Sequence, residues 1–271
     1  MTRFAVVGPG RAGGALAIAL HRAGHEVAAV IGRDRKRADL LAELVSARSY
    51  RLGSALPEAD IVLLAVRDDA IEPVAETLAE NLPAAAAVHL SGLQEIRTLQ
   101  SLAARGAAIG SWHPLQTLPN AEVGADRLEG AWMAITTDSE ELAALLEGVS
   151  QDLGARPFRL ADELKPLYHA AAAAAANYVT AALGLAESLA TAAGVPYEAA
   201  RPLVNAVTSN VFSFGAESAL TGPIARGDIS TVEAQLAGIR QHAPHLEEDF
   251  RAFGRATARL AGTLENFEGI L

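Results

Sequence analysis

The chain has 271 residues, of which 51% are hydrophobic, and this is enough apolar material for one large domain or two modest ones. Its 32 acidic and 22 basic side chains give a net charge of −10, which argues against binding to nucleic acid or to an anionic membrane through a general positive field. No cysteine is present, so disulfides, thiolate catalysis and cysteine-bound metals are excluded, and we expect no metal site.

The N-terminal residues predict a cytoplasmic protein. They follow a strand pattern and reach Gly8 too soon for a signal peptide. The most apolar long segment, residues 170–195, is mostly alanine and contains Asn177 and Glu187. That composition suits a buried helix better than a membrane span, so we expect no membrane attachment.

The chain opens with a strand over residues 4–7, a glycine turn and a helix over residues 12–20. Gly8, Gly10 and Gly13 fit G-x-G-x-x-G, in which the glycines allow the turn, the approach of a pyrophosphate and close helix packing. The helix start would face this anion with unpaired amides and its positive dipole end. A second strand over residues 25–31 completes a βαβ unit. A structural glycine turn is the alternative, but we predict a dinucleotide site that includes Gly8, Pro9, Gly10, Arg11, Ala12 and Gly13.

A basic turn follows the second strand. In this fold a carboxylate at this position binds the ribose hydroxyls of NAD, whereas glycine and arginine make room and charge for the 2′-phosphate of NADP. Gly32, Arg33, Arg35 and Arg37 match the second case. We therefore predict NADP (NADPH) as the cofactor, bound in part by Gly32, Arg33 and Arg35. The alternative is a solvated helix start that is basic by chance.

Further apolar runs predict the rest of a mostly parallel sheet. The run at 60–66 is nearly continuous, as expected for a central strand covered on both faces. Loops at the carboxyl ends of strands line the ligand crevice, so Val66 and Arg67 are predicted to contact the cofactor. The other predicted strands are 50–52, 86–90, 107–115, 131–136 and 156–160, and helices are predicted at 71–82, from Gly92 to about 105, and at 139–153.

From residue 162 the pattern changes to helix-period segments, with breaks at 194–196, at 221–228 and near Pro244. The sequence thus predicts an α/β fold with two domains: a Rossmann-type dinucleotide-binding domain at 1–161 and an all-α substrate and dimerisation domain at 162–271. An alanine-rich segment such as 170–195 must be covered, and about a hundred residues of helix make a thin cover alone. We therefore predict a homodimer formed through the helical domain.

Ser91 and His113 end successive predicted strands, at the edge where the nicotinamide of the cofactor should lie. A histidine there can exchange a proton with a substrate oxygen or nitrogen. Ser91 and Gly92 can contact the substrate without crowding the nicotinamide ring. The alternative for His113 is a rigid, partly buried turn in which it caps a backbone group.

Lys165, His169 and Asn177 begin the helical region. Their spacing places Lys165 and His169 on one helix face and Asn177 about 120° further round. Of the 22 basic residues only Lys36 and Lys165 are lysine, so Lys165 departs from the habit of the chain. Unlike arginine, lysine can lose its proton when desolvated, which makes Lys165 a candidate proton donor. The alternatives are a solvated lysine and an interhelical hydrogen bond from Asn177.

Arg226 and Asp228 lie in the most pronounced loop of the second half. They could bind a substrate carboxylate, or they could pair with each other across a turn. Both interpretations remain open at the level of sequence.

Together these motifs resemble one family. The glycine fingerprint, Ser91-Gly92, HPLQT from His113, KPLYHAAAAAAANY from Lys165 and LTGPIARGD from Leu220 resemble the Rossmann-like, DUF2520-containing proteins over essentially the whole chain. The wider group to which these proteins are related has a helical C-terminal domain of the 6-phosphogluconate-dehydrogenase-like type. It includes pyrroline-5-carboxylate reductases, ketopantoate reductases, β-hydroxyacid dehydrogenases and prephenate dehydrogenases. The resemblance implies NAD(P) binding, a helical second domain and a homodimer.

Partial matches within this group indicate different substrates. His113-Pro114 is similar to the H-P of prephenate dehydrogenases, whose histidine contacts the substrate hydroxyl, but the following Leu-Gln-Thr differs. Lys165 is similar to the lysine in the K-x-x-x-N of β-hydroxyacid dehydrogenases, except that His169 replaces the asparagine. The shared expectation is hydride transfer to or from a small, carboxylate-bearing substrate, a 2-oxo or hydroxy acid or an imine.

Two functions of different classes follow. One is an NADP-dependent oxidoreductase, with Lys165, His113 and His169 as catalytic candidates and Ser91, Gly92, Asn177, Arg226 and Asp228 as substrate-binding candidates. The other is a sensor or assembly protein that binds NAD(P) without turnover. Titratable groups that converge beside the nicotinamide would favour the enzyme, since a sensor needs only the fingerprint. On family grounds a deazaflavin hydride partner is a third possibility.

Overall fold

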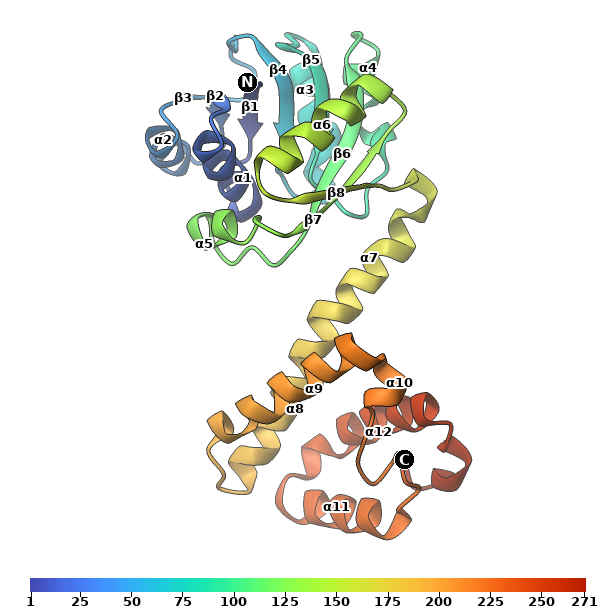
Figure 1. Ribbon diagram of the computed structural model, residues 1–271. Coiled ribbons are helices and arrows are strands. Elements are labelled where there is room, and N and C mark those ends of the chain that lie inside the picture. Colours follow the sequence, from blue (N-terminus) through green and yellow to red (C-terminus); the bar gives the residue numbers. More distant parts are fainter. The chain divides into compact units, whose positions relative to one another are not determined.

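The computed structural model describes residues 1–271, which divide by their internal contacts into two compact units, Met1–Ala173 and Ala174–Leu271 (Figure 1). The domain boundary predicted from the sequence lies earlier, at residue 161. Residues 162–173 fall in the first unit, where Lys165 and Tyr168 bond to side chains of its sheet.

The first unit contains one eight-stranded sheet with the strand order β3-β2-β1-β4-β5-β6-β7-β8. Neighbouring strands are parallel except β6 and β7. The first six strands have the order of dinucleotide-binding folds, which places a ligand crevice at the carboxyl ends of β1 and β4. Every strand overlaps a predicted one. The strands are β1 Arg3–Val7, β2 Glu26–Ile31, β3 Arg48–Tyr50, β4 Ala59–Leu64, β5 Ala84–His89, β6 Ala108–Leu115, β7 Trp132–Thr137 and β8 Arg156–Arg159.

Helices cover both faces of this sheet (Figure 1). They are α1 Arg11–Arg22, α2 Arg35–Leu44, α3 Ile71–Ala79, α4 Gln100–Ala103, α5 Ala121–Asp126, α6 Glu140–Asp152 and α7 Lys165–Ala173, with 3-10 turns at Asp68–Ala70, Ile96–Leu99 and Asp162–Leu164. Successive side chains of a strand point to opposite faces. Phe4 and Val6 of β1 therefore enter the core with α1, whereas Ala5 and Val7 enter the core with α3.

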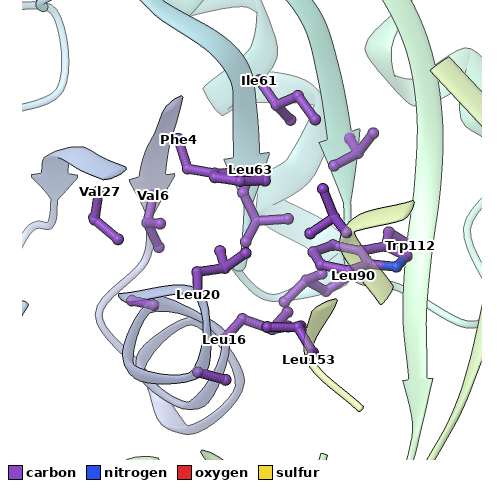
Figure 2. Close-up of a cluster of buried hydrophobic side chains, with 14 of the residues drawn as sticks. Phe4, Val6, Leu16, Leu20, Val27, Ile61, Leu63, Leu90, Trp112 and Leu153 are labelled. Atoms are coloured by element: carbon purple, nitrogen blue, oxygen red, sulfur yellow. The ribbon is translucent and has the colours of Figure 1, made fainter. Parts of the chain in front are cut away.

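Trp112 of β6 lies in the larger of the two cores (Figure 2). Its ring is fully buried and stacks on Phe4 with 6.5 Å between ring centres, and its Nε1 donates to Ser150 Oγ at 2.9 Å. Because Trp112 occupies one face of β6, its neighbours Ser111 and His113 point to the other face. The packing of the core thus orients the two side chains that the candidate site uses.

The second unit is entirely helical. Its elements are a π-helical turn Ala174–Tyr178, α8 Val179–Ala192, α9 Arg201–Phe214, α10 Ala216–Ala219, α11 Ile229–His242 and α12 Glu247–Ala261, with 3-10 turns at Tyr197–Ala200, Pro244–Leu246 and Leu264–Phe267. The predicted breaks separate α8 from α9, α10 from α11 and α11 from α12. The predicted fold class, a Rossmann-type sheet followed by an all-helical region, is confirmed.

The core of the second unit is small. Only Val232, Leu236, Ala258 and Phe267 form its buried cluster, and no residue of α8 or α9 is buried within the chain. None of the helices combines the length and the apolar composition that a bilayer crossing requires.

Candidate active site

The glycine turn between β1 and α1 has the geometry of a nucleotide site. Gly8 has a φ of +104°, and a Cβ there would lie 2.3 Å from the carbonyl oxygen of Ala65. A Cβ at Gly13 would lie 2.1 Å from the carbonyl oxygen of Gly8. Both positions therefore require glycine, the first for the turn and the second for the contact between helix and strand.

The N-terminus of α1 is open to a ligand. Gly10 is its N-cap, no side chain caps the helix, and the first turn carries no acidic residue. A Cβ at Gly10 would meet nothing within 4 Å. The amides of Arg11, Ala12 and Gly13 lie in this first turn, where helical amides lack internal partners. A pyrophosphate fits this arrangement of open space, free donors and positive dipole.

The turn after β2 leaves one arginine free. Arg35 pairs with Asp39 at 3.0 Å and Arg37 pairs with Asp34 at 3.4 Å, whereas Arg33 is exposed and makes no ion pair. Gly32 is required here because a Cβ would lie 2.7 Å from Cγ of Pro9. Arg33 is thus the guanidinium best placed, by its lack of a partner, to bind a 2′-phosphate.

Val66 and Arg67 follow β4, as predicted. Val66 is half-buried beside Gly8, with its Cγ1 3.2 Å from the place of a Gly8 Cβ. Arg67 is exposed and its Nε lies 3.0 Å from Asp69 Oδ1. The Arg67 guanidinium is therefore already paired with a carboxylate.

His113 and Tyr168 form a hydrogen-bonded pair on the face of β6 opposite to Trp112. His113 Nδ1 lies 2.7 Å from Tyr168 Oη, and the two rings meet edge to face. Burial lowers the pKa of His113 to about 4, with smaller contributions from the positive charges of His169 and Lys165. Burial raises the pKa of Tyr168 to about 12. Both groups are therefore neutral near pH 7.

Ser91 and Gly92 form the loop beside this pair. A Cβ at Gly92 would lie 2.9 Å from both Cε1 and Nε2 of His113, so only glycine leaves the ring in place. Ser91 Oγ donates to Asp68 at 2.9 Å and accepts from the amides of Leu93 and Gln94. The Ser91 hydroxyl hydrogen is already used inside the protein.

Lys165 is buried, with 1% of its surface exposed. Its Nζ donates to Ser111 Oγ at 2.9 Å and lies 3.8 Å from Asp162 Oδ1. Burial lowers the pKa of Lys165 to about 8, although Asp162 acts in the opposite direction, and burial likewise raises the pKa of Asp162. Both partners shift toward neutrality, which is the behaviour of a weakly coupled pair in a dry environment. A solvated lysine is excluded.

A second histidine, His89 at the end of β5, lies under the loop. It is fully buried, and its Nδ1 accepts from the Ser91 amide at 3.1 Å. Burial, together with the charge of Lys165, lowers its pKa to about 3. His89 Nε2 has no hydrogen-bond partner. Its bond to the Ser91 amide holds the Ser91-Gly92 loop against the sheet.

The remaining candidates lie elsewhere or in other roles. His169 is exposed on α7, so it does not share the buried surroundings of Lys165. Asn177 lies in the π-helical turn of the second unit and is exposed, so the regular helical spacing assumed for it was wrong. Asp228 caps α11 by accepting from the Thr231 amide at 3.1 Å, and it makes no ion pair with Arg226, which is exposed.

Tyr168, Ser111 and His89 were not predicted as site residues, although the sequence held a signal for each. Tyr168 follows Lys165 by three residues, which is about one helical turn. Ser111 precedes His113 by two, which places both on one strand face. His89 ends the strand next to β6.

Family comparisons identify both halves of the chain. Residues 3–88 match the family described as NADP oxidoreductase, coenzyme F420-dependent, and residues 131–257 match the domain of unknown function DUF2520. The chain joins an NADP oxidoreductase domain to a DUF2520 domain. The resemblance to DUF2520-containing proteins, the enzyme class and NADP as cofactor are thereby confirmed. No curated protein matches the sequence.

Several solved structures share the fold. A Bacteroides fragilis protein that is proposed to be an NADP oxidoreductase superposes with a TM-score of 0.83 at 23% identity, over 95% of this chain and 98% of the other. A reductive aminase from Aspergillus terreus with NADPH and ethyl-5-oxohexanoate gives 0.68 at 19% identity, over 98% and 99%. An imine reductase from Myxococcus stipitatus with NADP+ gives 0.70 at 16% identity, over 96% and 93%. These likenesses establish the fold.

Proposed function

We propose that this oxidoreductase transfers a hydride between NADP and a C=O or C=N carbon of a small substrate that carries a carboxylate. The observation that supports this most is that His113, Tyr168 and Lys165 gather where β5 and β6 end, at the sheet edge that also carries the glycine turn. A sensor that only bound the cofactor would need the turn and not these groups.

Within this proposal, the bound cofactor supplies the hydride, and the protein supplies orientation and the proton. His113 is neutral and can donate from Nε2 to the substrate oxygen or nitrogen as charge develops there. Lys165 supplies positive charge beneath the site, and His169 is a further proton donor at its exposed rim. Gly92 gives the substrate access to the edge of His113, and Ser91 shapes that loop.

The cofactor would be bound by the glycine turn with Pro9 and the first turn of α1, by Gly32, Arg33 and Arg35, and by Val66 and Arg67. For the substrate carboxylate, Arg226 offers an exposed guanidinium, with Asn177 and Asp228 as further polar contacts. The carbonyl and imine chemistry of the substrate class is supported by the reductive aminase and imine reductase among proteins of the same fold. We also infer a cytoplasmic location, from the early glycine of the first strand, which cell fractionation tests.

The test is a screen for NADPH oxidation with three substrate classes: 2-oxo acids, the corresponding oxo esters and cyclic imines with and without a carboxylate. We expect turnover of at least one carboxylate-bearing compound and a loss of activity when its carboxylate is esterified. Tight NADPH binding without turnover of any compound would favour the sensor. Because the matching family description also names coenzyme F420, a reduced deazaflavin is included as an alternative hydride donor.

A further inference from the structure

The hydrogen bond between Tyr168 and His113 has a defined direction. At neutral pH the phenol is protonated and the imidazole is neutral. An imidazole nitrogen is a better acceptor than a phenol oxygen, and the distance of 2.7 Å is typical of an O–H donor. Tyr168 therefore donates to Nδ1, and the ring of His113 carries its own hydrogen on Nε2.

The hydrogen-bearing nitrogen faces the Gly92 loop. The place of a Gly92 Cβ is 2.9 Å from Nε2 and from Cε1, so this edge of the ring lies against the one residue that adds no side chain. The loop follows β5, whose carboxyl end lies at the same sheet edge as the glycine turn. The Nε2–H is thus directed toward the side of the ring on which the cofactor domain opens.

Tyr168 is itself held in place. Its ring meets Phe158 of β8 at 6.0 Å between centres, and the helix that carries it is fixed one turn earlier by the bond from Lys165 to Ser111. Tyr168 is half-buried, so its hydroxyl is both oriented by packing and partly screened from water.

We propose that Tyr168 is a positioning residue that holds His113 in the Nε2–H tautomer and replaces the hydrogen that His113 gives to the substrate. This rests on the proposed hydride transfer. As the substrate oxygen or nitrogen gains a proton, the Nε2–H bond breaks and the Tyr168 hydrogen moves to Nδ1, so the imidazole stays neutral. For a carbonyl substrate the step is favourable because an alkoxide is a stronger base than the phenolate left on Tyr168. After product release a solvent proton enters at Nε2, and the phenolate recovers its hydrogen from Nδ1.

The first test is 15N NMR of histidine-labelled protein saturated with NADP+, with His113→Asn used to assign the signals. We expect wild-type His113 as the Nε2–H tautomer, with a hydroxyl proton coupled to Nδ1. Tyr168→Phe keeps the ring contacts and removes only the hydroxyl, so its His113 should become a mixture of tautomers. Tyr50→Phe is the matched control, since the Tyr50 hydroxyl makes no hydrogen bond, and it should leave His113 unchanged.

A wild-type Nδ1–H tautomer would overturn the proposal, and so would a Tyr168→Phe variant that remains purely Nε2–H. If Tyr168→Phe does not fold, the wild-type coupling between the hydroxyl proton and Nδ1 decides. None of these readings requires turnover, so they stand apart from the substrate screen. With a substrate in hand, Tyr168→Phe should lower kcat by about 10²-fold and leave the KM for NADPH unchanged. An unchanged kcat would contradict the relay.

Discussion

Gly92 acts at the residue scale through the side chain it lacks. In Gly92→Ala the new methyl would lie 2.9 Å from the His113 ring, which must turn away and strain its bond to Tyr168. We expect at least about a tenfold loss of kcat, since proton transfer depends on geometry. NADPH affinity should stay within twofold, because the cofactor turn is untouched. Gly148→Ala, where a Cβ meets nothing within 4 Å, is the control. An active Gly92→Ala enzyme would show that the ring is not held here.

Lys165 illustrates a residue kept at a cost to stability. Its folded pKa of about 8 lies below the ordinary value of 10.5, so the unfolded chain binds the proton more tightly and the buried charge costs about 3 kcal/mol at pH 7. Lys165→Met removes this cost but strands the Ser111 hydroxyl, worth about 1 to 2 kcal/mol. We expect a net gain of about 1 to 2 kcal/mol in unfolding free energy at pH 7 and a loss of turnover.

The pH dependence separates this explanation from a packing effect. The charge penalty is complete below pH 8 and falls as the pH rises toward 10.5, so the advantage of Lys165→Met should shrink over that window. Urea unfolding at pH 7 and at higher pH measures it. Lys36→Met, at an exposed lysine, should change little at either pH. A Lys165→Met variant that is strongly destabilised at pH 7 would mean that the lysine is a structural brace.

At the scale of elements, the turn between β2 and α2 sets cofactor choice. Arg33 is the arginine without a carboxylate partner, and charge-assisted bonds to a 2′-phosphate are worth about 1.5 to 3 kcal/mol. NADPH should bind at least tenfold more tightly than NADH, and Arg33→Ala should remove most of this difference. Fluorescence titration of both cofactors measures it, with the ion-paired Arg37→Ala as control. Equal wild-type affinities would exclude the role.

The same scale explains how α7 serves the site. One turn of helix places Lys165 on Ser111 and Tyr168 on His113, and β6 presents those two partners with the spacing of one strand face. Two periodicities, of the helix and of the strand, thus converge on four side chains.

At the scale of the molecule, the helical unit does not cover its own apolar surface. Leu203, Val207, Phe212 and Phe214 of α9 are 66%, 50%, 88% and 67% exposed, and the buried cluster of the unit has four residues. Such surfaces mark association sites. We therefore expect a homodimer, with twice the chain mass of 28.1 kDa in light scattering. Phe212→Asp should weaken it, whereas Leu40→Asp, at an exposed leucine of α2, should not. A wild-type monomer at micromolar concentration would contradict the dimer.

The sequence alone determined the cofactor domain, because its signals are local. Gly8 and Gly13 are required by contacts within one βαβ unit, and apolar runs mark strands that are covered on both faces. The strand overlaps and the NADP oxidoreductase match follow from such short-range patterns. Ser91 and His113 were found in the same way, as the ends of strands.

Only the tertiary structure decided the chemistry around them. Tyr168 was overlooked and His169 preferred, because which of two adjacent helical residues meets His113 depends on how α7 is rotated against the sheet. The burial of Lys165 and the occupied hydroxyl of Ser91 depend on partners 54 and 23 residues away. Sequence periodicity gives the face of an element, whereas long-range packing sets what that face meets, and with it the protonation of each group.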